Sequence, residues 1–196
     1  MSLRGSSTPP RSSSRGPRAL SVTEERLRRL CPPGKPAIIA GIAAGFDRLA
    51  PGYAVDTRLR ICHFLAQAAH ETDRFRTLEE YGGATYFARY EGRGDLGNTR
   101  RGDGARFHGR GIFQLTGRAN YRRYGVLLGV DLEAEPTLAM QAEISLAIAF
   151  AYWRERAINA AADADDVVTV TRLINGGRNG LADRRRLLAL AKRIWL

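Results

Sequence analysis

Hydrophobic residues recur at helical spacing in several parts of the chain, and turn-forming residues separate these parts. No alternation of apolar and polar residues, the mark of a half-buried strand, extends beyond a few positions. The sequence therefore predicts a mostly α fold without an internal repeat. Helices are predicted over residues 23–30, 36–49, 56–71, 143–156, 167–174 and 181–196.

The helix predicted over 56–71 differs from the others because it is apolar around most of its circumference. It carries Leu59, Ile61 and Leu65 together with several small alanines. A helix that is hydrophobic on nearly all sides is typical of a buried position. We therefore expect this helix to lie at the centre of the fold.

Residues 81–111 show no sustained period and contain nine glycines. Irregular segments of this length inside a domain usually serve a function, because a glycine-rich chain has little intrinsic order. The sequence predicts a long functional loop here.

The first twenty residues contain six Ser, three Pro, four Arg and no acidic residue. This composition offers too little apolar surface to offset the entropy of ordering the chain. We expect a flexible basic tail over 1–20 and one folded domain over 21–196.

Net charge is +11, and subtracting the four tail arginines leaves +7 for the rest of the chain. Such a charge attracts polyanions, which include nucleic acid, anionic cell wall and acidic lipid. The longest apolar stretches, 36–46 and 144–153, are too short to span a bilayer. The N-terminal residues lack the apolar core of a signal peptide, so synthesis in the cytoplasm is expected.

The sequence gives no indication of a metal or organic cofactor. Cys31 and Cys62 form no CxxC pair and are expected to be free thiols. His70-Glu71 opens a zinc-protease-like HExxH pattern, but the position four residues after His70 is Arg74.

Four glutamates lie on the central helix or around the glycine-rich segment: Glu71, Glu79, Glu80 and Glu91. A carboxyl group on a buried helix beside a cleft is suited to general acid catalysis, because desolvation favours its protonated form. Inverting glycoside hydrolysis uses such an acid and a basic carboxylate roughly 6.5 to 9.5 Å away. The alternative is that the loop glutamates only solvate the loop or pair with arginines.

Three separated motifs make the chain from Thr23 to Leu196 resemble glycoside hydrolase family 19, which contains plant-type chitinases and many phage endolysins. They are His70-Glu71-Thr72, the run GRGIFQLT over 109–116 with Asn120, and LINGG over 173–177 before Asp183-Arg184. The run YEGR over 90–93 is similar to the bacterial and phage branch. The resemblance implies a lysozyme-like, two-lobed helical domain with a catalytic cleft.

The resemblance also implies a role for each matching residue. Glu71 matches the general acid that protonates the glycosidic oxygen, and Thr116 matches a hydroxyl that helps to hold the attacking water. Arg184 matches an arginine beside the acid. The other matches shape the site or hydrogen-bond sugar groups: His70, Gln114, Asn120 and Asn175.

Two positions match the general base. The plant branch places it about twenty-two residues after the acid, nearest to Glu91, whereas phage lysins often have a Glu nine residues after the acid, which is Glu80 here. Both are retained as candidates. The plant pattern also has an acidic residue where this chain has Asn179.

The function expected from the resemblance is that of a peptidoglycan-degrading endolysin, which hydrolyses β-1,4 bonds between N-acetylhexosamines by inversion and acts on the cell wall after release. The expected partners are peptidoglycan strands and the anionic envelope, with no nucleic acid, and the protein is expected to be a monomer. A chitinase is the alternative with the same chemistry. The alternative from another class is a non-catalytic cationic protein that binds cell wall or nucleic acid.

Overall fold

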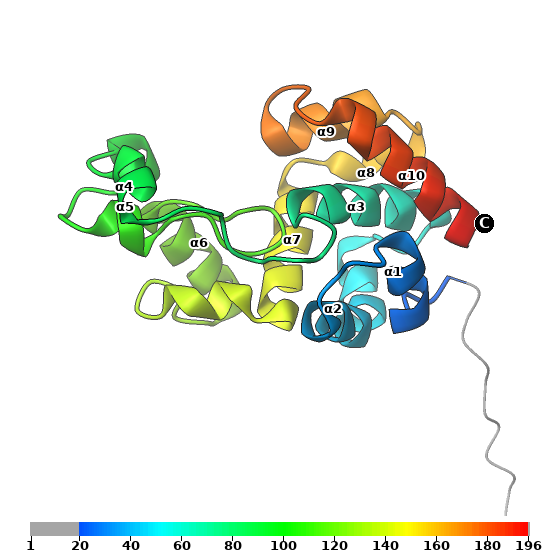
Figure 1. Ribbon diagram of the computed structural model, residues 1–196, viewed down its shortest axis with the longest axis horizontal. Coiled ribbons are helices and arrows are strands. Elements are labelled where there is room, and N and C mark those ends of the chain that lie inside the picture. Colours follow the sequence, from blue (N-terminus) through cyan, green and yellow to red (C-terminus); the bar gives the residue numbers. More distant parts are fainter. Residues whose placement is uncertain (1–19, 196) are drawn as a thin grey trace, which may run out of the picture.

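The computed structural model describes residues 20–195, and in that range the chain is mostly helical (Figure 1). The β structure within these residues consists of isolated bridges that join Arg110 to Glu79 and to Leu115. The predicted fold class is therefore confirmed.

The first two predicted helices are present. Helix α1 (Glu24–Leu30) begins after Thr23, whose hydroxyl accepts a hydrogen bond from the Arg26 amide. Helix α2 (Pro36–Leu49) has a proline in its first turn and continues into the short helix η1 (Ala50–Tyr53).

Helix α3 (Arg58–Glu71) is the buried centre of the larger lobe, as the sequence predicts. Residues 61–69 are all buried, and they include the polar side chains of His63 and Gln67. The C-terminal helix α10 (Leu181–Trp195) packs along α3 (Figure 1). This packing places the C-terminal helix beside α3, although the two helices are more than a hundred residues apart in the sequence.

The molecule has two lobes, each with its own hydrophobic core. The larger lobe contains α1, α2, α3 and α10 together with α8 (Ile158–Asp163) and α9 (Val167–Asn175). Its core includes the contacting rings of Phe46, Phe64 and Phe150. The smaller core contains Phe107 and Tyr121.

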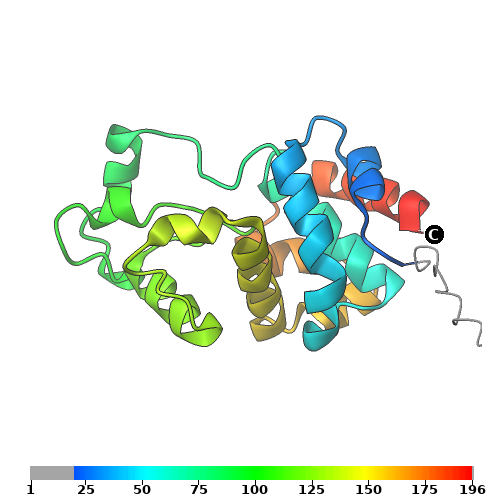
Figure 2. The same cartoon turned by 90° about the horizontal axis from the view of Figure 1, so that it is seen from below.

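Helix α7 (Ala142–Glu155) connects the two lobes (Figures 1 and 2). Leu146 and Phe150 on this helix belong to the larger core, whereas Ile148 and Ala151 belong to the smaller one. One rigid helix therefore fixes how the lobes face each other.

The segment 81–111, for which the sequence predicts irregular structure, contains several single-turn helices. These are α4 (Ala84–Phe87), η2 (Ala88–Tyr90), η3 (Gly94–Leu96) and α5 (Asp103–Arg106). Buried polar contacts order the segment: the Asp103 carboxylate accepts hydrogen bonds from the Arg118 guanidinium and from the Arg100 amide.

The smaller lobe also contains α6 (Arg118–Leu128) and η4 (Pro136–Met140), which no sequence pattern predicted. Helix α6 carries several arginines and Gly125, which obscure its apolar face. It ends at Gly129 with φ of +68°, a backbone conformation that favours glycine.

Residues 1–19 of the predicted tail lie outside the described residues. Leu20, the last residue of that predicted tail, packs against the larger core. The adjacent Val22 amide donates a hydrogen bond to Asp47 at 3.0 Å. The folded domain thus includes the chain from Leu20 onward.

Cys31 and Cys62 are buried free thiols, as the sequence predicts. Burial raises the pKa of Cys31 to about 12 and that of Cys62 to about 11. Within residues 20–195, no helix has the length and apolar character needed to cross a membrane.

Candidate active site

Glu71 is the last residue of α3, and a sharp turn after it fixes the end of the helix. Residues 73–75 all have positive φ although none is glycine, a conformation that costs on the order of 1 kcal/mol or more for each residue. The Thr72 hydroxyl holds this turn by donating to the Ala68 carbonyl oxygen and accepting from the Phe75 amide. The Phe75 side chain is fully buried. The sequence His-Glu-Thr followed by Phe therefore encodes the turn that positions Glu71.

Arg184 of α10 holds the Glu71 carboxylate. Its guanidinium donates to Glu71 Oε1 at 2.5 Å, and the exposed fraction is 2% for the Arg184 side chain and 19% for that of Glu71. Glu71 Oε2 accepts no hydrogen bond from any residue in the range 20–195. One oxygen is thus anchored, while the other is available to a substrate.

The other donors of Arg184 connect the acid to two further parts of the larger lobe. One amino group donates to the buried Gln67 Oε1, and Nε donates to the Asn179 carbonyl oxygen at 3.1 Å. The Asn175 side chain donates to the same carbonyl at 3.0 Å and accepts from the Gly177 amide at 2.8 Å. Asn175 therefore shapes the turn that supports Arg184, and its polar groups are engaged within that turn.

Asp183 anchors His70 beside the acid. The His70 Nδ1 atom lies 2.7 Å from Asp183 Oδ2, and the Arg74 guanidinium donates to both carboxylate oxygens at 2.9 and 2.6 Å. The hydrogen bonds from Arg74, supplemented by those from His70 and Arg186, hold the pKa of Asp183 well below its usual range despite partial burial. His70 thus has a fixed orientation next to Glu71.

Gly180 leaves space for the His70 ring. A Cβ atom at position 180 would lie 2.3 Å from His70 Nε2, and φ at this glycine is +70°. Both the contact and the backbone conformation require glycine.

A cavity of about 280 Å³ is lined by three of the predicted site residues: Thr116, predicted to hold the attacking water, and the predicted binding residues Gln114 and Asn120. Tyr152 from α7 and Ile174 from α9 complete its wall toward the larger lobe. The Tyr152 hydroxyl donates to the Ile174 carbonyl oxygen at 2.7 Å. Burial raises the pKa of Tyr152, an effect that Arg156 opposes and the nearby Glu71 charge reinforces. Glu71 is therefore within electrostatic range of the cavity wall.

A chain of hydrogen bonds fixes these three predicted site residues along the cavity wall. Thr116 Oγ1 donates to the Gln114 carbonyl oxygen at 2.9 Å, and the Asn120 side chain donates to the Thr116 carbonyl at 2.7 Å. Gln114 has a φ of +52°, and its side-chain amide nitrogen donates to the Gly111 carbonyl oxygen. Because the Thr116 proton is used internally, its hydroxyl oxygen remains an acceptor.

Glu80 adjoins this group of residues. Its Oε1 accepts from Arg89 at 2.6 Å and from the Tyr90 hydroxyl at 2.8 Å, and Oε2 accepts from the Gly109 amide at 3.0 Å. A Cβ atom at Gly109 would lie 3.0 Å from Glu80 Oε2 and 2.7 Å from Gln114 Oε1. Glu80 and Gln114 therefore converge over this glycine.

Glu91 lies in a different environment. Its two carboxylate oxygens accept from the Gly102 and Gly104 amides at 2.6 and 2.8 Å. These contacts tie Glu91 to the backbone of the glycine-rich segment. Like Glu71 and Glu80, Glu91 does not line the cavity itself. Glu79, the other loop glutamate, contacts His108 Nε2 at 2.9 Å and Arg110 at 3.6 Å.

Sequence reasoning missed several residues of the site. Gln67 and Asp183 received no role, although they hold Arg184 and His70. Tyr152 and Arg156, which line the cavity, belong to a helix interpreted only as apolar. The position of Gln67 between apolar residues of the predicted central helix could have indicated a buried hydrogen-bonding role, because a buried polar side chain needs a partner.

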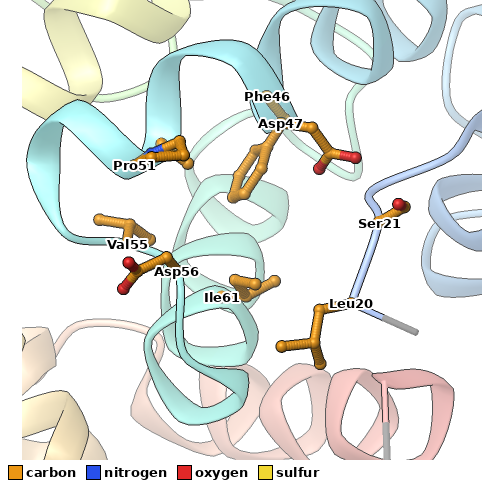
Figure 3. A pocket seen from close by; sticks show the side chains of 9 residues that line it. Leu20, Ser21, Phe46, Asp47, Pro51, Val55, Asp56 and Ile61 are labelled. Carbon is orange, nitrogen blue, oxygen red and sulfur yellow. The ribbon is translucent and has the colours of Figure 1, made fainter. Parts of the chain in front are cut away.

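Another cavity, of about 480 Å³, lies between α2, the start of α3 and Leu20 (Figure 3). Phe46 and Ile61 form its apolar wall, and Asp47 and Asp56 contribute carboxylates. It contains none of the predicted site residues. No group of three or more His, Cys, Asp or Glu residues within 20–195 is arranged to hold a metal ion.

Comparison with known proteins shows the family of the chain. The family model of chitinase class I, glycoside hydrolase family 19, matches residues 36–179. A glycosyl hydrolase family 19 domain-containing protein of Haemophilus influenzae is 38% identical over 98 residues, which are 50% of this chain and 47% of that protein. Endochitinase EP3 of Arabidopsis thaliana is 33% identical over 132 residues, with 59% of this chain and 47% of that protein covered.

The fold has a solved counterpart in chitinase C of Streptomyces griseus, with a TM-score of 0.73 and 22% identity over 90% of this chain and 77% of the other. The chain spans about half the length of the curated relatives that it matches. The match to the family model covers most of the described chain, including the smaller lobe, Glu71 and the cavity, and it ends before α10. The chain belongs to glycoside hydrolase family 19.

Proposed function

We propose that the chain hydrolyses β-1,4 bonds between N-acetylhexosamines by inversion, with Glu71 as the general acid. The observation that carries the proposal is the state of the Glu71 carboxyl group. Buried Arg184 anchors one oxygen, and the other oxygen accepts no hydrogen bond from residues 20–195. A general acid needs such an oriented oxygen within reach of the leaving group.

In the proposed reaction, Glu71 Oε2 donates a proton to the glycosidic oxygen as its bond to the anomeric carbon breaks. A water molecule attacks that carbon from the opposite face and gives its proton to a carboxylate base. The products are two sugar chains with new hydroxyl groups. Exchange with solvent then returns the proton from the base to Glu71.

We assign the base to Glu80 rather than Glu91. Glu80 converges with Gln114 over Gly109, and the Thr116 hydroxyl oxygen next to Gln114 is free to accept a hydrogen bond from water. The donors around Glu80 suit an ionised carboxylate, the form that a base requires. Glu91 instead binds two backbone amides of the glycine-rich segment.

We propose peptidoglycan as the polymer, and a role as a bacterial or phage wall-degrading enzyme. The net charge of +7 after the first twenty residues favours an anionic wall over neutral chitin. Chitin is the second candidate, because Endochitinase EP3 and chitinase C are named for activity on that polymer.

The substitution Glu71→Gln tests the chemistry. It keeps the side-chain volume and an oxygen that can accept from Arg184, but it removes the transferable proton. Turnover is therefore expected to fall on the order of a hundredfold or more in a protein that still folds. Glu24→Gln, on the exposed face of α1, is the matched control and should retain full activity. A well-folded Glu71→Gln variant that keeps a tenth of the wild-type rate would remove Glu71 from the mechanism.

Initial rates on purified sacculi and on a soluble chitin oligomer, at matched sugar concentration, test the substrate. Peptidoglycan is expected to be cleaved faster, on the order of a hundredfold, because its extra groups contribute to transition-state binding. Faster cleavage of the chitin oligomer would assign the chain to chitin instead.

A further inference from the structure

Two guanidinium groups line the cavity that contains Gln114 and Thr116, and their partners differ. Arg123 is paired with Glu155 at 2.8 Å, and the Tyr124 hydroxyl donates to the same carboxylate. Arg156 forms no ion pair with any residue in the range 20–195. The charge of Arg123 is thus matched within the protein, whereas that of Arg156 is not.

The position of Arg156 is fixed by its neighbours. It follows the last residue of α7, and the next residue, Ala157, has a φ of +50° that ends the helix. The guanidinium carbon lies 3.6 Å from the centre of the Tyr152 ring. Stacking uses the flat face of a guanidinium and leaves the N–H groups along its edge available to an acceptor.

Arg154 offers a matched comparison outside the cavity. Arg154 also stacks on a tyrosine ring, that of Tyr53 at 4.6 Å, and it too forms no ion pair within the described residues. Yet Arg154 does not line the cavity. Both arginines are exposed and stack on a tyrosine ring, but only Arg156 lines the cavity.

An unpaired cation in a sugar-binding cavity has no ionic partner on a neutral N-acetylglucosamine chain. A peptidoglycan strand differs because every second sugar carries a lactyl group, which ends either in a free carboxylate or in a peptide that bears carboxylates. A guanidinium binds a carboxylate through parallel N–H···O hydrogen bonds.

We infer that Arg156 recognises a carboxylate of the lactyl-peptide branch and thereby favours peptidoglycan over chitin. This inference rests on the proposed glycosidase function. It adds a specificity-determining residue to the cavity wall, opposite in role to Arg123, whose charge Glu155 already neutralises.

The test compares wild type, Arg156→Gln and the matched control Arg154→Gln on three substrates. These are intact sacculi, glycan strands from which an amidase has removed the peptides so that the lactyl carboxylates are free, and a soluble chitin oligomer without carboxylates. For Arg156→Gln, kcat/KM is expected to fall about tenfold on a carboxylate-bearing substrate and less than twofold on the chitin oligomer. Arg154→Gln should match wild type on all three.

The pattern of losses identifies the carboxylate. A loss on intact sacculi alone assigns Arg156 to a peptide carboxylate, and a loss on the stripped strands alone assigns it to the free lactyl carboxylate. A loss on both substrates shows that Arg156 binds either carboxylate. Equal losses on all three substrates, no loss on any of them, or the same losses for Arg154→Gln would overturn the inference. A wild-type protein that cleaves only the chitin oligomer would instead refute the peptidoglycan proposal itself.

Discussion

The two lobes hold their candidate catalytic carboxylates in different ways. Glu71 is held by the buried Arg184, a residue 113 positions away on another helix of the larger lobe. Glu80 is held by a backbone amide and by Arg89 and Tyr90, nine and ten positions away, with 47% of the Arg89 side chain exposed. The acid thus depends on the packing of α3 against α10, and the base depends on the local path of a glycine-rich chain.

Because of this difference, losing the partner of each carboxylate should change the free energy of unfolding by a different amount. A buried charge without its partner is costly, whereas an exposed ion pair contributes little. We therefore expect changes on the acid side to alter stability and activity together. Changes on the base side should alter activity with a smaller effect on stability.

The largest expected effect on stability comes from removing Arg184. Arg184→Met leaves Gln67 and Glu71 without their donor, and the free energy of unfolding is expected to fall by about 3 kcal/mol. Urea denaturation followed by circular dichroism measures this change. Arg89→Ala, which breaks the exposed ion pair to Glu80, should cost less than about 1 kcal/mol. Equal losses for the two variants would show that the lobes do not differ in this way.

A smaller but more selective effect is expected from the two base candidates. Glu80→Gln should lower turnover on the order of tenfold to a hundredfold with little change in melting temperature, because an amide cannot accept the proton from water. Glu91→Gln weakens a hydrogen bond to the Gly102 or Gly104 amide, so it should cost about 1 kcal/mol of stability and leave turnover within a few-fold of wild type. Rates and thermal melts of both variants decide between them, and the reversed pattern would make Glu91 the base.

The sequence predicts the larger lobe better than the smaller one, because most helices of the larger lobe have a clear hydrophobic pattern. Helices such as α2 carry a hydrophobic period that is visible without knowledge of the fold. Helix α6 of the smaller lobe carries several arginines and a glycine that obscure its apolar face. The exception in the larger lobe is α8, which has only 6 residues and begins after Ala157, a residue with positive φ. Conformations of that kind are fixed by tertiary contacts, which no local pattern indicates.

The same limit applies to the site. Glu71 and Arg184 were identifiable because motifs accompany them in the sequence, and the structure places them in direct contact. Arg156 follows an apolar helix, and no sequence motif accompanies it. The role that we propose for Arg156 depends on the absence, among the described residues, of an acidic side chain that pairs with its guanidinium. Only the three-dimensional arrangement shows that Glu155 pairs with Arg123 and leaves Arg156 without an acidic partner among residues 20–195.

The smallest expected effect concerns pH and the buried end of α3. His63 is fully buried, its Nε2 lies 2.9 Å from Asp165, and its Nδ1 has no hydrogen-bond partner within residues 20–195. Burial lowers the pKa of His63 below the model-peptide value of 6.5, although Asp165 opposes the shift. The unfolded chain therefore binds more protons than the folded one just below pH 6.5, so stability is fully present above that pH and decreases as the pH falls toward the lowered pKa. Urea denaturation at pH 7.5 and pH 5.5 should show a larger loss for wild type than for His63→Gln, which has no titrating group at this position. Identical losses in the two proteins would assign the pH dependence to other groups.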